Sequence, residues 1–130
     1  MRKTVLIAIA ALAAALLVAA PAAPAGNDRD REVIRTGNCS GATDWKLKAK
    51  LDDGRLEVEF EVDSNRNGQT WSVRITDNGV QVFAGSRTTQ PPSGSFEVER
   101  HIANRAGVDR IRARATNART GESCTGNLQI

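Results

Sequence analysis

Residues 45–62 read WKLKAKLDDGRLEVEFEV, and no other stretch constrains the architecture as tightly. On both sides of Asp53-Gly54, apolar and charged side chains alternate with the two-residue period of a β-strand. An Asp-Gly pair favours a type I′ turn, in which both central residues adopt positive φ. We therefore predict a hairpin with a two-residue loop. Its register sets Lys50 opposite Glu57, Lys48 opposite Glu59, Lys46 opposite Glu61 and, on the other face, Leu47 opposite Phe60.

A second hairpin is predicted at Asn78-Gly79, where the alternating residues 70–77 end. A two-residue turn there places Phe83 opposite Arg74 on the outer face of the sheet. No segment beyond residue 31 has a convincing helical period. Alternation instead recurs in four further segments, at residues 32–36, 95–102, 109–116 and 122–128.

Seven or eight short strands separated by turns are typical of an all-β domain. We predict an immunoglobulin- or fibronectin III-like sandwich at residues 32–130, with a small closed β-barrel as the alternative. The chain has two cysteines, Cys39 and Cys124, and an even number in an exported domain predicts a disulfide. Neither cysteine has a histidine or a second cysteine close by in the sequence, which argues against a metal or redox site.

The first 25 residues have the pattern of an export signal. Arg2 and Lys3 precede an uncharged run at residues 5–20, which is shorter than the roughly 20 residues that a membrane span needs. We expect a signal peptide at residues 1–25, cleavage after Ala25 and a flexible leader at residues 26–31. An uncleaved N-terminal anchor is the alternative. The predicted location is therefore secreted or associated with the cell envelope.

The charge balance argues against a nucleic-acid partner. The 18 basic residues include Arg2 and Lys3, so 16 remain in the exported chain against 15 acidic residues. A nucleic-acid-binding protein needs a positive surplus to displace counterions, and this chain has almost none. Three Phe, two Trp and no Tyr also leave few aromatic side chains on which bases or sugars would stack.

Five short segments carry a resemblance to known proteins: Gly37-x-Cys39-Ser40-Gly41, Trp45-Lys46-Leu47-Lys48, Asn104-Arg105-Ala106-Gly107, Ala113-Arg114-Ala115-Thr116-Asn117 and Gly121-Glu122-x-Cys124. In these segments the chain resembles a group of small secreted actinobacterial proteins. The resemblance implies export and a β-sandwich with a single disulfide. That group has no assigned activity, so the resemblance implies no catalytic residue.

Two motifs are candidates for a metal-binding site and a catalytic site. Asp63, Asn65 and Asn67, followed by Gly68, match the first half of a calcium loop, but Arg74 occupies the twelfth position, where a glutamate belongs. A polar turn is therefore favoured over a weak calcium site. His101, the single histidine, lacks the sequence context of a catalytic triad and is interpreted as a solvated strand residue. We expect no enzyme activity, no metal and no cofactor.

The outward charges suggest a contact surface. In a sandwich, the glutamates at residues 57, 59, 61, 97 and 99 fall on one sheet and a row of arginines falls on the other. Arginine rows bind anionic polymers or acidic proteins, although a solvated face is the alternative. The predicted contact residues are Arg74, Phe83, Arg110, Arg112 and Arg114.

The sequence thus favours a non-enzymatic binding module that is a monomer and has no membrane span after cleavage. Its partner is an anionic envelope polymer or an unknown protein. The alternative function is a secreted protease inhibitor that presents residues 87–94, where Pro91-Pro92 restricts the backbone and lowers the entropy cost of binding.

Overall fold

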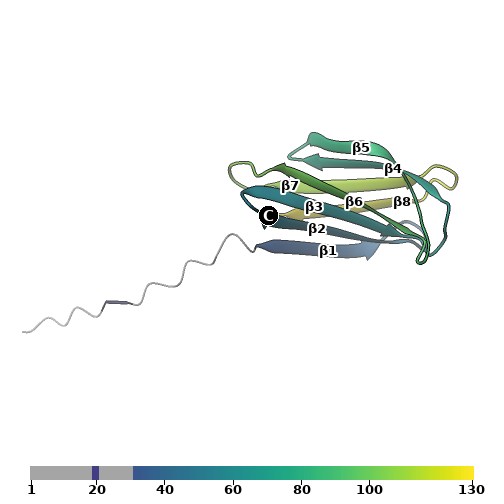
Figure 1. Ribbon diagram of the computed structural model, residues 1–130, viewed down its shortest axis with the longest axis horizontal. Coiled ribbons are helices and arrows are strands. Elements are labelled where there is room, and N and C mark those ends of the chain that lie inside the picture. Colours follow the sequence, from purple (N-terminus) through teal and green to yellow (C-terminus); the bar gives the residue numbers. More distant parts are fainter. Residues whose placement is uncertain (1–18, 21–30) are drawn as a thin grey trace, which may run out of the picture.

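The computed structural model describes residues 19–20 and 31–130, so most of the predicted export signal and most of the leader lie outside the described residues. Residues 31–130 form two four-stranded antiparallel sheets packed face to face (Figure 1). Sheet A has the order β1-β2-β3-β6, and sheet B has the order β5-β4-β7-β8. The strands are β1 (Glu32–Asn38), β2 (Asp44–Asp52), β3 (Arg55–Asp63), β4 (Thr70–Asp77), β5 (Val80–Thr88), β6 (Ser95–Ala103), β7 (Arg110–Asn117) and β8 (Ser123–Gln129).

This topology confirms the predicted sandwich. If β1 is set aside, β2-β3-β6 faces β5-β4-β7-β8, which is the arrangement of a seven-stranded fibronectin III-like domain. No strand ladder joins the two sheets within residues 31–130, so the alternative of a small closed barrel is wrong. The inward side chains of both sheets form one buried core, in which Trp71 and Phe60 are the largest fully buried side chains.

The first hairpin has the predicted register at every position. Lys50, Lys48 and Lys46 lie opposite Glu57, Glu59 and Glu61, and Leu47 lies opposite Phe60. Asp53 and Gly54 have φ values of 47° and 76°, as a type I′ turn requires. The alternation of apolar and charged residues therefore places Leu47 and Ala49 in the core and the lysines outside it.

The second hairpin departs from its predicted register. Its turn at Asn78-Gly79 forms as expected, but a β-bulge then shifts the pairing between Ile75 and Thr76. Ile75 consequently pairs with Phe83, and the aromatic ring points into the sandwich, where it is only 7% exposed. The prediction that Phe83 lies on the outer face is therefore wrong. Ala84 takes its place opposite Arg74.

The predicted disulfide is present and joins the two sheets. Cys39 directly follows β1 of sheet A, and Cys124 lies in β8 of sheet B. Beside the disulfide, the indole ring of Trp45 packs against Gly37 of β1 and Gly126 of β8. These contacts close one lateral edge of the sandwich. Within the described ranges, no helix is long and apolar enough to cross a membrane.

Candidate interaction faces

Four of the five predicted contact residues lie together on the outer face of sheet B. Arg110, Arg112 and Arg114 alternate along β7 with buried neighbours, so all three guanidinium groups project outward. Arg74 of β4 lies directly opposite Arg114 and is exposed as well. We call these four residues the arginine face. Phe83 does not belong to it, because its ring is buried between the sheets.

Among the outward strand positions of sheet B, the arginine face has no acidic neighbour. Its remaining outward strand positions carry only hydroxyl, amide or small side chains: Thr70, Ser72, Thr76, Gln81, Ala84, Ser86, Thr88, Thr116, Ser123, Thr125, Asn127 and Gln129. No ion pair among residues 31–130 engages any of the four arginines. Their positive charges are therefore left for solvent or for a partner.

A shallow hollow of about 660 Å³ extends the arginine face to the edge of the sandwich. Arg110 and Arg112 line it together with Arg35, which comes from β1 of the other sheet. Asn127 and Gln129 of β8 also line the hollow, and no carboxylate does. Arg35 was not among the residues predicted from sequence. The pairing of β1 with β2 places Arg35 opposite Leu47, and its inward orientation follows from that pairing.

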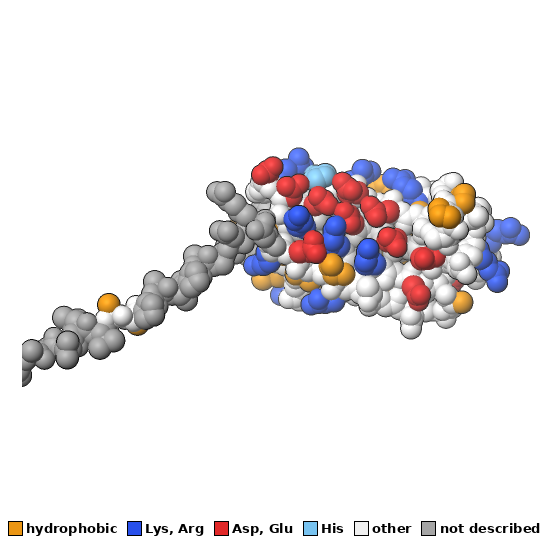
Figure 2. Space-filling model, turned by 60° about the horizontal axis from the view of Figure 1, so that its bottom comes forward, with side chains coloured by type: hydrophobic (Ala, Val, Ile, Leu, Met, Phe, Trp, Pro, Cys, Tyr) orange, Lys and Arg blue, Asp and Glu red, His pale blue; other side chains and the backbone are white. Residues whose placement is uncertain are grey.

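The outer face of sheet A has the opposite character. Figure 2 shows carboxylates gathered around the single histidine, with basic side chains beside them. Lys48 Nζ lies 2.8 Å from Glu59 Oε2 and 3.9 Å from Glu57 Oε1, and Lys46 Nζ lies 3.8 Å from Glu61 Oε2. We call this surface the acidic face; its carboxylates belong to Glu57, Glu59, Glu61, Glu97 and Glu99.

The acidic face is only partly neutralised, and its pKa values reflect this. The pKa of Glu57 is raised because its carboxyl group shares a hydrogen bond with Glu59, is partly desolvated and lies near two negative charges. Burial and neighbouring carboxylates likewise raise the pKa of Glu97. The pKa of Lys48 is raised mainly by its hydrogen bond to Glu59. The two outer faces of the sandwich therefore carry opposite electrostatic fields.

The segment that resembles half a calcium loop is a turn stabilised by its own polar groups. Asp63 Oδ1 accepts a hydrogen bond from the backbone N–H of Asn65, whose φ is 56°. The backbone carbonyl of Arg66 accepts hydrogen bonds from the hydroxyl groups of Ser64 and Thr89. These contacts are those of an Asx turn between strands, and they support the interpretation as a polar turn.

Residues 87–94, assigned to the alternative inhibitor function, are compact. Arg87 and Thr88 belong to β5, and Thr89 is buried. The remainder is a tight turn, closed by hydrogen bonds from the N–H groups of Gln90 and Gly94 to the carbonyl oxygens of Ser95 and Gln90. Such a turn holds no extended backbone of the kind that a protease cleft binds.

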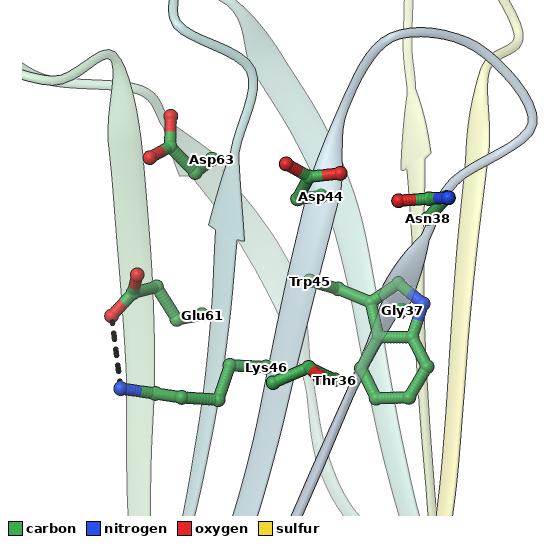
Figure 3. A pocket seen from close by; sticks show the side chains of 8 residues that line it. All are labelled: Thr36, Gly37, Asn38, Asp44, Trp45, Lys46, Glu61 and Asp63. Atoms are coloured by element: carbon green, nitrogen blue, oxygen red, sulfur yellow. Dashed lines mark ion pairs between the residues drawn. The ribbon is translucent and has the colours of Figure 1, made fainter.

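A second hollow, of about 420 Å³, lies beside Trp45 (Figure 3). Asp44 and Asp63, which are opposite each other in the β2–β3 ladder, line it together with the Lys46–Glu61 ion pair. Because the indole is held against two glycines at the sandwich edge, its position follows from packing. We assign this hollow no ligand.

One end of the sandwich contains a buried pair of carboxyl groups that the sequence analysis also missed. Asp77 and Asp109 are each 1% exposed. Burial raises the pKa of Asp77 to about 6, with further contributions from a hydrogen bond to Asp109 and its charge, while Arg105 opposes the shift. The Nε atom of Arg105 lies 3.5 Å from Asp77 Oδ2. Both side chains are closed off from solvent, so a dissolved substrate has no access to them.

No family model matches the chain, and no curated protein or solved structure matches it either. The resemblance to secreted actinobacterial proteins therefore stays a prediction.

Proposed function

We propose that this protein is an exported, non-enzymatic binding module whose arginine face holds an anionic polymer of the cell envelope. One observation carries the proposal. Arg74, Arg110, Arg112 and Arg114 share a sheet surface without any carboxylate, and no ion pair engages them within residues 31–130.

A regular row of arginines suits a repeating anion. Alternate residues of a strand are about 7 Å apart, so Arg110, Arg112 and Arg114 present three positive charges at equal steps. Guanidinium groups form paired hydrogen bonds to phosphate or carboxylate oxygens, and hydroxyl and amide groups surround them here. The hollow that Arg35 shares with Arg110 and Arg112 offers a place where one anionic group is held from two sheets.

Export is part of the proposal and has two supports. The N-terminal pattern is that of a signal peptide, and Cys39 and Cys124 form a disulfide of the kind that persists in oxidising compartments. The inhibitor alternative has no comparable support, because residues 90–94 form a closed turn.

The test is co-sedimentation of the exported chain, residues 26–130, with cell-wall material at low and high salt. We expect binding that weakens as salt is added, because the charges are exposed and screened. Arg112→Glu should weaken binding at low salt about tenfold, equivalent to ~1.4 kcal/mol. Lys50→Glu is the matched control, because it makes the same charge change on sheet A.

Two results would overturn the proposal. Equal loss of binding in both variants would mean that net charge, and not the arginine face, governs adsorption. Absence of binding at either salt concentration would exclude the polymer and direct the search to an acidic protein, by pull-down from culture supernatant with wild type and Arg112→Glu.

A further inference from the structure

Three potential metal ligands meet on the outer face of sheet A, on three adjacent strands. Asp52 ends β2, Glu57 lies in β3, and His101 lies in β6, directly opposite Glu57 in the ladder. One ligand atom from each of the three lies within 4.8 Å of the other two. These atoms come from paired strands and not from loops, so their backbone positions are fixed.

The histidine separates this group from an ordinary acidic surface. Its Nδ1 atom lies 4.0 Å from Asp52 Oδ2, and its Nε2 atom lies 3.3 Å from Glu99 Oε1. Metal-binding histidines commonly coordinate through one ring nitrogen while the other donates a hydrogen bond to a carboxylate. His101, with Asp52 on one side and Glu99 on the other, has this arrangement before any ion binds.

The carboxylates around the group also favour a cation, although the guanidinium of Arg55 donates a hydrogen bond to the backbone carbonyl of His101. Glu57, Glu59 and Glu99 bring carboxylate oxygens within 4.8 Å of one another, and Lys48 is the lysine that contacts Glu57 and Glu59. Asp52 and Glu99 form no ion pair with a lysine or arginine among residues 31–130. A divalent cation at His101 would relieve the repulsion among these carboxylates.

We propose that Asp52, Glu57 and His101 bind a divalent transition-metal ion such as Zn²⁺, with Glu99 orienting the imidazole. One imidazole and two carboxylates suit a borderline ion, whereas Ca²⁺ and Mg²⁺ prefer oxygen ligands alone. Zinc bonds of about 2.0–2.2 Å to nitrogen and oxygen require ligand atoms somewhat closer than 4.8 Å. Rotation of the partly exposed side chains supplies this movement.

This site is independent of the arginine face, because the two lie on opposite sheets. A failure of one proposal therefore leaves the other standing. Metal binding can also be followed at one residue. His101 is the single histidine in the chain, so every imidazole signal in an NMR spectrum belongs to it.

The experiment titrates the exported chain with Zn²⁺ alone at pH 7.5 and follows the His101 ring resonances and the heat of binding. We expect one ion per chain, shifted ring resonances and a higher melting temperature, because the ion binds the folded state. Ca²⁺ at the same concentration should leave the ring resonances unchanged. His101→Gln should lose the binding heat, and Glu99→Gln should weaken binding about tenfold.

Asp63→Asn is the matched control, because it removes a partly exposed carboxylate outside the group and should bind Zn²⁺ like wild type. Unshifted ring resonances in the wild-type chain would overturn the proposal without reference to any variant. Zinc binding that persists in His101→Gln would also overturn it, since the ion would then be adsorbed by the carboxylates alone.

Discussion

The position of the Trp45 indole requires glycine, which has no side chain, at two neighbouring positions. A Cβ atom at Gly37 would lie 2.6 Å from Cζ2 of the indole, and one at Gly126 would lie 2.7 Å from its Cζ3. Both distances are too short for real atoms, so the ring occupies its place only because both positions are glycine. The alternation in residues 45–51 predicts that Trp45 faces inward, but local sequence does not reveal which strands meet its ring.

We expect Gly126→Ala to lower the free energy of unfolding by about 1–3 kcal/mol, because the new methyl group displaces the indole. Urea unfolding of wild type, Gly126→Ala, Trp45→Leu and the double variant measures the coupling. The cost of Gly126→Ala should shrink when Trp45 is already leucine. An equal cost in both backgrounds would mean that the glycine matters for its backbone and not for the ring.

At the level of elements, the two hairpins show what turn chemistry predicts and what it does not. Asp53-Gly54 and Asn78-Gly79 form the expected turns, and the first register follows directly. In the second, the bulge turns Phe83 inward at the edge where β5 meets β6. The guanidinium groups of Arg87 and Arg100 lie 4.8 and 4.7 Å from the centre of its ring. Whether Phe83 faces inward or outward is governed by tertiary packing, which no local sequence pattern encodes.

Phe83→Leu tests the inward assignment. We expect a loss of about 1 kcal/mol in stability, because a buried ring with two cationic neighbours is exchanged for a smaller side chain. Salt-sensitive binding to cell-wall material should stay at the wild-type level, measured by the same co-sedimentation. A binding loss as large as that of Arg112→Glu would show that Phe83 contacts the partner.

At the scale of the whole molecule, sites built from distant strands are the ones that sequence cannot predict. Three members of the arginine face, Arg110, Arg112 and Arg114, follow from alternation along β7, because they are close in sequence. The Asp52–Glu57–His101 group requires the pairing of β3 with β6, and two intervening strands belong to the other sheet. Similarly, Asp77 and Asp109 come together only when β4 and β7 pair.

The buried Asp77–Asp109 pair makes stability depend on pH. The pKa of Asp77 is about 6 in the folded protein and near 3.9 in an unfolded chain. Between these values the folded state binds more protons, so this residue makes stability fall as pH rises from about 4 to 6. Asp77→Asn, with Asp109 and Arg105 retained, should be more stable than wild type at pH 7.5, by at most about 3 kcal/mol.

Thermal unfolding of both proteins from pH 4 to pH 7.5 checks this expectation. The difference in melting temperature should be largest at pH 7.5 and should vanish near pH 4, where the wild-type carboxyl group is protonated. A constant difference across that range would show that the substitution acts through packing and not through titration.

Because its two outer faces carry opposite charges, the molecule is electrically asymmetric from sheet A to sheet B. On a polyanionic wall it would settle with sheet B downward, and every adsorbed copy would show its carboxylates to the surrounding medium. A layer of such molecules would leave the surface charge negative. A layer of a uniformly basic protein would instead reverse it. The wall would gain an outer layer that still repels anions, and whose ligands for metal ions all face the environment.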